Sequence, residues 1–133
     1  MPIVKVEMLM GKSPEYKKTV LDCIHDGLVE SIGIEDWDRF QRIIEFDRND
    51  FEFPSFKSDD FMIIELTVFP VRTKEQKEKV IETIIGNLKS RLSKQGASYE
   101  APYMYLTIKF CLQLPDHIIF LHSPKRSGFI RSL

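Results

Sequence analysis

The sequence begins MPIVKVEMLMGKSPEYK (residues 1–17), and this stretch decides how the rest of the chain is organised. The β-branched residues that follow Pro2 predict a strand over residues 3–10, which a glycine ends. The Ser-Pro-Glu segment at 13–15 predicts the start of a helix. A serine caps a helix N-terminus, a proline fits its first turn, and an acidic residue interacts favourably with its dipole. The chain therefore opens as a strand, a turn that carries Lys12, and a helix.

Pro2 is the candidate catalytic group of this stretch. Aminopeptidases commonly remove Met1 before a small second residue, and we expect this to leave Pro2 with a free secondary amine. An α-amino group titrates near pH ~7.7–8.0, so a modest shift makes it a proton carrier at neutral pH. The ring fixes φ and with it the direction of the nitrogen. The alternative is a proline that only begins a strand, where its missing N–H costs least.

The composition predicts one soluble domain over residues 1–133, because the chain is long enough for one core, and 43% of its residues are apolar and 29% charged. A net charge of −1 argues against a nucleic-acid or membrane surface. No stretch has the pattern of an export signal or a membrane span. Cys23 and Cys111 are isolated thiols that lack metal-ligand spacing, so we expect a reduced, cytoplasmic setting.

Hydrophobic periodicity predicts the remaining elements. The first helix should run to Gly33 and a second helix from Thr73 to Gly96, each with an apolar stripe at helical spacing. Residues 34–39 predict an acidic turn, and the aromatic residues of the loop at 47–60 should fold back on the core. Further strands are expected at 40–46, 62–69 and 103–112, with residues 118–121 as a candidate short strand. The aromatic residues of the loop are Phe51, Phe53 and Phe56.

A shift of sixty positions aligns the first half of the chain with the second without a gap. Glu15 then falls on Glu75 and Lys12 on Arg72, and the match extends to the apolar stripes of both helices. We therefore expect an internal repeat, residues 2–60 and 61–122, followed by a tail at 123–133. The predicted fold is α+β, with duplicated β-α-β units, a four-stranded mainly parallel or mixed sheet and two long helices on one face. The alternative is a chance likeness of two amphipathic units.

These residues resemble the tautomerase superfamily, whose members are built from β-α-β units and use an amino-terminal proline. The family pattern is Pro-Ile at the start and Gly-Arg-Ser-x-Glu-Gln-Lys after the first strand. Here residues 2–3 are Pro-Ile, residues 11–17 read GKSPEYK with Lys12 in place of the arginine, and residues 71–77 read VRTKEQK. The segment DRFQ at 38–41 is similar to the fused-repeat branch of malonate semialdehyde decarboxylase, and His25 matches a helix histidine of that branch. The resemblance covers residues 2–95.

The resemblance implies Pro2, Asp38 and Arg72 as catalytic residues. In the family the proline acts as acid or base, or adds to a carbonyl, and arginines hold the substrate carboxylate. Arg72 would take that role here, with Lys12 and His25 as further substrate-binding residues. The partner arginine of the decarboxylase branch falls on Pro70. A solvated turn cation is the alternative for Arg72, an N-cap or surface pairing for Asp38, and a packing histidine for His25.

Three hypotheses for the function follow. The first is a cofactor-independent tautomerase, a keto–enol isomerase of small 2-oxo or enol carboxylates, assembled as a homotrimer as the resemblance implies. The second is a lyase of the decarboxylase or hydratase type. The third is a non-catalytic trimeric binding protein of the same fold, which the retention of Met1 would favour. We expect a small carboxylate as the partner, no nucleic acid and no membrane, and no metal at His117 or His122.

Overall fold

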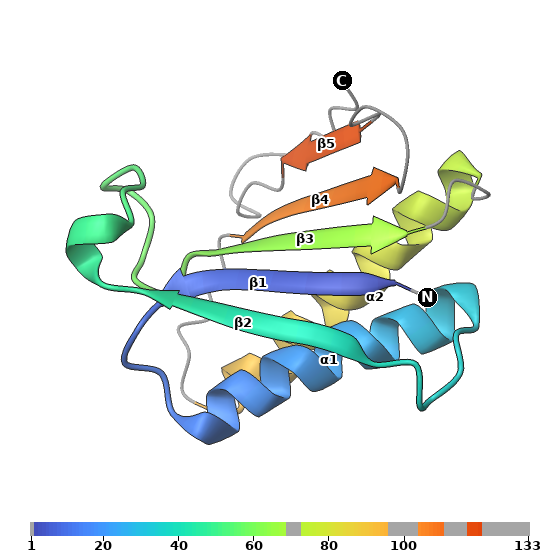
Figure 1. Cartoon of the computed structure of the whole chain (residues 1–133), viewed down its shortest axis with the longest axis horizontal. Coiled ribbons are helices and arrows are strands. Elements are labelled where there is room, and N and C mark those ends of the chain that lie inside the picture. Colours follow the sequence, from blue (N-terminus) through green and yellow to red (C-terminus); the bar gives the residue numbers. More distant parts are fainter. Residues whose placement is uncertain (1, 69–72, 96–103, 111–116, 121–133) are drawn as a thin grey trace.

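The computed structural model describes residues 2–68, 73–95, 104–110 and 117–120, the last two ranges as backbone alone. Its elements follow the predicted order, with a short 3-10 helix in the central loop and an additional strand at the end (Figure 1). The elements are β1 (Ile3–Leu9), α1 (Pro14–Ile32), β2 (Phe40–Phe46), η1 (Arg48–Asp50), β3 (Met62–Val68), α2 (Lys74–Ser93), β4 (Met104–Phe110) and β5 (His117–Phe120).

All these strands belong to one mixed sheet, in the order β2-β1-β3-β4-β5. The pairs β1–β2 and β3–β4 are parallel, as a crossover helix requires, whereas β1–β3 and β4–β5 are antiparallel. The prediction of a four-stranded sheet is therefore wrong by one strand. β5 pairs along the outer edge of β4, from His117 opposite Ile108 to Phe120 opposite Tyr105, and this pairing makes a full strand of the short candidate segment.

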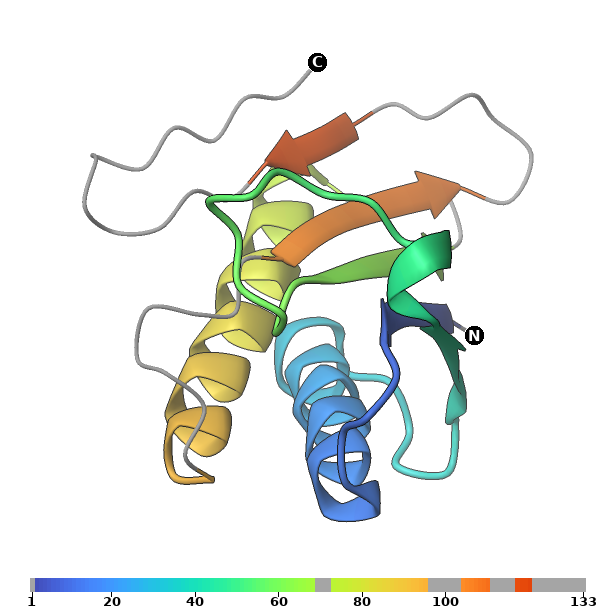
Figure 2. The same cartoon turned by 90° about the vertical axis from the view of Figure 1, so that its left-hand side faces the viewer.

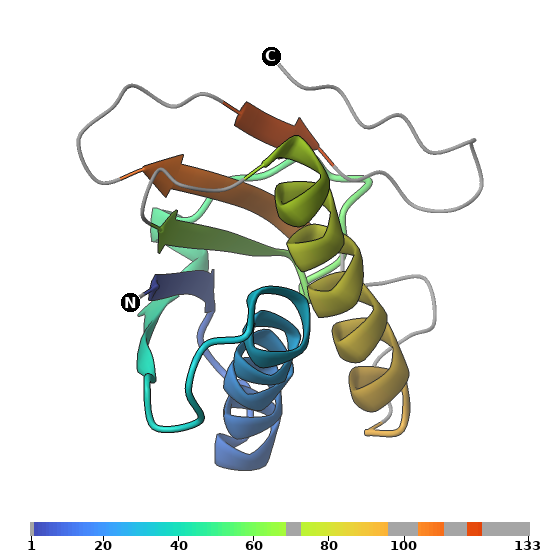
Figure 3. The same cartoon turned by 90° about the vertical axis from the view of Figure 1, so that its right-hand side faces the viewer.

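The prediction of two helices on one sheet face is confirmed. α1 and α2 lie side by side against the same face (Figures 2 and 3). Alternate residues of β1 and β3 point into the layer between sheet and helices, together with the apolar stripes of both helices. The buried core consists mainly of Val4, Val6, Met8, Val20, Ile24, Leu28, Met62, Ile64, Leu66, Val80, Ile81, Ile84, Leu88 and Leu92.

Both helices begin where the sequence predicts, because local hydrogen bonds cap them. The Ser13 hydroxyl accepts from the Tyr16 N–H at 3.1 Å. Thr73 and Gln76 form a reciprocal capping box at the start of α2. α1 ends at Gly33, whose φ of 65° is the left-handed conformation that favours glycine at a C-cap.

Each half of the described chain contains a strand, a capped helix and a second strand parallel to the first. The two N-caps, Ser13 and Thr73, are sixty positions apart, as the repeat predicts. This arrangement supports the repeat of residues 2–60 and 61–122, which stays a prediction as to its origin and bounds. The predicted tail at 123–133 and Gly96, the predicted end of the second helix, lie outside the described residues.

The central loop is packed around its own aromatic cluster. The Phe51 ring contacts those of Phe46, Phe53 and Phe61 in tilted or edge-on arrangements, with ring centroids 5.3 to 5.9 Å apart. The rings of Phe53 and Phe61 are 5.1 Å apart. The prediction that Phe56 folds back on the core is wrong, because its side chain is 68% exposed. Its ring instead lies 5.1 Å from the ammonium of Lys57. The loop therefore has a small satellite core of its own, apart from the main one.

Candidate active site

Pro2 is a buried residue directly before β1. Its neighbour Ile3 is paired with Phe40 at the start of β2 and with Thr67 near the end of β3. Because β2 runs parallel and β3 antiparallel to β1, the start of β2 and the end of β3 meet at this edge of the sheet. We call this end of the strands the Pro2 edge. It comprises Pro2, the turn at 34–39 and the end of β3, and it lies at the end of the sheet marked N in Figure 1.

Asp38 lies at the Pro2 edge, in the turn between α1 and β2. Its N–H donates to the Glu35 carbonyl at 3.0 Å, and the Arg39 N–H donates to the Trp37 carbonyl at 2.9 Å. These bonds fix the turn just before β2 pairs with β1. The Asp38 side chain is half-buried, with Oδ1 shielded from solvent. The fold thus brings two of the three expected catalytic residues, Pro2 and Asp38, to one edge.

Arg39 contacts α1 and so holds the same turn against the helix. Its guanidinium donates to Asp22 Oδ1 at 2.6 Å and to Gln41 Oε1 at 3.5 Å. The Gln41 amide in turn donates to the Leu21 carbonyl at 3.1 Å. The turn that carries Asp38 is therefore attached both to α1 and to β2.

Arg72, the third expected catalytic residue, lies outside the described residues, as does Pro70. The elements on either side are described: β3 ends at Val68 and α2 follows its N-cap Thr73. Figure 1 shows the end of β3 and the first turn of α2 at the same end of the molecule as the N-terminus. The role of Arg72 at the Pro2 edge therefore stays a prediction.

His25 is buried on α1, with 1% of its surface exposed. Its Nε2 lies 3.4 Å from Oδ1 of Asp36, in the turn that also carries Asp38. Its Nδ1 is shielded and has no hydrogen-bond partner among the described residues. His25 thus packs beneath the Pro2 edge, and at this burial it is positioned to hold the turn.

Lys12 lies beyond the opposite end of β1 from Pro2. β1 has seven residues, which span roughly 23 Å in an extended strand. The Lys12 ammonium forms an ion pair with Asp60 and lies 5.0 Å from the centroid of the Tyr16 ring. Within one chain, the fold therefore does not bring Lys12 to the Pro2 edge.

Two exposed aromatic residues at the Pro2 edge were not among the predicted site residues. Trp37 is 77% exposed and Phe40 is 47% exposed, and they flank Asp38 and Arg39 in the sequence. The signal that could have found them is an aromatic residue within a run of charged ones, which is not expected of a purely solvated turn. Among the residues that the structure describes, no three or more His, Cys, Asp or Glu side chains form a group that could hold a metal ion.

Comparisons with known proteins find matches to tautomerase enzymes over most of the chain. A family model described as a tautomerase enzyme matches residues 2–53, and a second family model of the same description matches residues 38–96. The chain belongs to the tautomerase superfamily. Tautomerases are isomerases, so the chain belongs to a family of isomerase enzymes.

Individual proteins agree with this assignment. The chain is 27% identical over 97 residues to a probable tautomerase, YusQ, of Bacillus subtilis (strain 168), a match that covers 69% of this chain and 76% of the relative. Its fold is similar to that of malonate semialdehyde decarboxylase, with a TM-score of 0.70, 18% identity, and coverage of 82% of this chain and 84% of the other. A native fused 4-OT gives a TM-score of 0.66 at 18% identity, with coverage of 96% and 94%.

In the described ranges, neither α1 nor α2 combines the length and the apolar character that a membrane-spanning helix requires.

Proposed function

We propose that the chain catalyses the keto–enol tautomerisation of small 2-oxo or enol carboxylates without a cofactor. The observation that supports this proposal most directly is the meeting of Pro2, the Asp38 turn and the end of β3 at one edge of the sheet. In such a site, one group takes a proton from carbon and returns a proton to another atom of the same molecule. A secondary amine that titrates near neutral pH can do both.

Each residue has a separate role in this proposal. The Pro2 nitrogen, freed by removal of Met1, is the acid and base. The guanidinium of Arg72 binds the substrate carboxylate, for which its planar fork is suited. Asp38 orients the amine or a water molecule at the same edge. His25 acts through the turn, by its contact with Asp36, and Lys12 would reach this substrate only from a second copy of the chain.

We also propose that the chain assembles as a homotrimer. Fused 4-OT proteins of the same fold form trimers, with TM-scores of 0.64 and 0.61 to this chain. The sheet face opposite the helices carries the exposed apolar residues Phe40 and Ile44, which is the kind of surface that association buries. A cytoplasmic location stays a prediction.

The first experiment measures the ketonisation of an enolised aryl pyruvate by the wild type and by Pro2→Ala. Alanine also allows removal of Met1, so the two proteins differ in the secondary amine and its ring. We expect the rate to fall by about a hundredfold or more, the range that acid–base groups contribute. Pro14→Ala is the matched control, because Pro14 lies in the first turn of α1 at the other end of β1. Equal rates for wild type and Pro2→Ala would remove Pro2 from the mechanism.

An intact-mass measurement of the same material establishes whether Met1 is present. A retained Met1 would block the amine and favour the non-catalytic trimeric binding protein. A loss of activity in Pro2→Ala, with Met1 removed from both proteins, supports the enzyme.

A lyase of the decarboxylase or hydratase type is the second candidate, and the half-buried Asp38 at the Pro2 edge favours it. A carboxylate beside the amine could orient a water molecule. It could also destabilise a substrate carboxylate through repulsion between the two negative charges. Release of carbon dioxide from a 3-oxo acid by the wild type, and a larger fall of this activity than of tautomerase activity in Asp38→Asn, would identify this reaction.

A further inference from the structure

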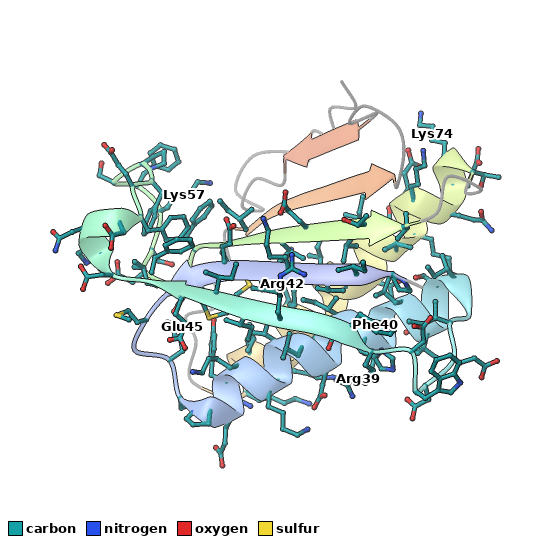
Figure 4. All side chains as sticks on the ribbon, in the orientation of Figure 1. Arg39, Phe40, Arg42, Glu45, Lys57 and Lys74 are labelled. Atoms are coloured by element: carbon teal, nitrogen blue, oxygen red, sulfur yellow. The ribbon has the colours of Figure 1, made fainter. Side chains whose placement is uncertain are left out.

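The central loop, residues 47–60, forms one side of the molecule at the end of the strands opposite to the Pro2 edge. Its residues line a cavity that is open to solvent. Its volume is about 520 Å³, within the range of roughly 300–1,000 Å³ typical of ligand pockets. A smaller cavity of about 220 Å³ adjoins it, since Arg48 and Asp59 line both. Figure 4 shows Lys57 at this end of the molecule and Lys74 at the other.

The cavity is held in shape by contacts on several sides. Phe51 and Phe53 line it and belong to the aromatic cluster of the loop. Arg48 forms an ion pair with Asp59 across the cavity wall. Lys12 pairs with Asp60 and so attaches the loop to the turn between β1 and α1. The loop is therefore built before any ligand arrives, which reduces the entropy that binding costs.

The cavity combines an apolar wall with a cation that is partly withdrawn from water. Phe51, Phe53 and Lys57 are half-buried, whereas the other charged lining residues, Arg48, Glu52 and Asp59, are exposed. Arg48 and Asp59 neutralise each other. Burial lowers the pKa of Lys57 below its ordinary value, because its ammonium is partly withdrawn from water. An anion bound there would add to the contacts that this ammonium already makes, among them the Phe56 ring at 5.1 Å.

We propose that this cavity is a second binding site, distinct from the Pro2 edge, for a small aromatic carboxylate. The ring of the ligand packs against Phe51 and Phe53, and its carboxylate lies against the Lys57 ammonium. The site binds without catalysing tautomerisation, because no chain-terminal amine lies at this end of β1. It therefore does not depend on the function proposed for Pro2.

The experiment is a titration of the ¹⁵N-labelled protein with phenylacetate, which has the ring and the carboxylate but no oxo group to react. We expect saturable amide shifts in residues 48–59, and weaker ones with acetate, which lacks the ring. Shifts confined to residues 35–40 would place binding at the Pro2 edge alone and overturn the proposal, as would the absence of saturable shifts. The same titration of Pro2→Ala should give the same shifts at 48–59, whatever becomes of its catalysis.

Variants then assign the binding to the named side chains. Lys57→Gln should weaken phenylacetate binding about tenfold, the usual effect of losing one charge-assisted hydrogen bond, and Lys57→Arg should retain it. Phe53→Leu should weaken binding of phenylacetate more than that of acetate. Lys74→Gln is the control, because it removes an exposed lysine at the other end of the molecule. Unchanged thermal unfolding verifies that each variant is folded, and wild-type affinity in a folded Lys57→Gln would overturn the proposal.

Discussion

Tyr16 is a buried residue whose hydroxyl has no hydrogen-bond partner among the described residues. Burial, and then the nearby Asp60 carboxylate, raises the pKa of this phenol well above its ordinary value. The ring of Tyr16 packs in the core, and the Lys12 ammonium lies 5.0 Å from its centroid. The hydroxyl oxygen contributes little to stability, because it forms no hydrogen bond with the described residues. A buried polar atom without a partner is a site at which removal of that atom should not harm the fold.

We expect Tyr16→Phe to leave the free energy of unfolding at neutral pH unchanged or to raise it by up to about 1 kcal/mol. The raised pKa means that the folded state keeps a proton which the unfolded state loses above pH ~10, so wild-type stability falls as pH rises there. The variant should show a shallower fall. Urea unfolding of both proteins across alkaline pH measures this difference, and a clear loss of stability at neutral pH would mean that the hydroxyl is satisfied.

Cys23 is a fully buried thiol that donates from Sγ to the Asn87 carbonyl at 3.4 Å. Burial raises its pKa to about 11 from the model-compound value of 9.0. The folded state therefore retains this proton between about pH 9 and 11, where the unfolded state loses it. Stability from this group is complete below pH 9 and is lost as pH rises toward 11.

Cys23→Ser should remove this part of the alkaline loss of stability, which amounts to about 3 kcal/mol at most. Serine retains a donor for the Asn87 carbonyl but does not titrate in this range. The measurement is the slope of unfolding free energy against pH for both proteins. Identical slopes would show that Cys23 titrates alike in the folded and unfolded states.

The crossing of α1 and α2 depends on a glycine. A Cβ at Gly27 would lie 2.6 Å from Cγ1 of Ile84 and 3.2 Å from its backbone N and Cα atoms. The two helices can approach this closely only because Gly27 has no side chain, and Asp26 and Arg91 add an ion pair of 2.6 Å beside the contact. The packing of the helical layer is therefore set at one short contact.

Gly27→Ala should destabilise the protein by about 1–3 kcal/mol, because the helix axes must separate or Ile84 must leave its rotamer. Gly86→Ala on α2 is the matched control, since nothing lies within 4 Å of its added Cβ. That control should gain about 0.5–1 kcal/mol from the higher helix propensity of alanine. Thermal or urea unfolding measures the stability of both variants against the wild type. Equal stabilities of the two variants would contradict the close approach of the helices at Gly27.

In the described residues, the two helices cover one face of the sheet, and the other face is open. The open face carries Phe40 and Arg42 of β2 at its margin (Figure 4). The exposed Ile44 follows on the same strand, and Lys5 of β1 forms ion pairs with Glu7 and Glu65. Its mixture of apolar and charged residues is typical of an interface whose register is set by charges. The proposed trimer would bury this face.

Ile44→Lys should prevent the proposed assembly, because it places a charge at the apolar margin of the open face without touching the core. Sedimentation velocity should then give a monomer for the variant and a trimer for the wild type. Met10→Lys is the control, because Met10 is also exposed, at 57%, but lies in the bend after the last residue of β1 and not in the sheet. A variant that still sediments as a trimer would show that association uses another surface.

The sequence by itself determined the elements, because the features that specify them are local. Ser13 and Thr73 cap the helices on residues three positions later, Gly33 ends α1 through its own φ, and the apolar stripes repeat at the helical period. The first strand, the turn motif and Pro2 also led to the superfamily, and the strand–helix order led to the α+β fold.

Contacts between distant residues were decided only by the tertiary structure. Strand direction and register bring Pro2 and Asp38 to one edge and leave Lys12 at the other, and no local pattern encodes that separation. Pairing with β4 makes a strand of residues 117–120, and the ring cluster around Phe51 leaves Phe56 exposed. The cavity beside Lys57 arises in the same way. Its walls come from residues that meet only when the loop closes on itself, and side-chain packing in three dimensions determines which face of a loop turns inward.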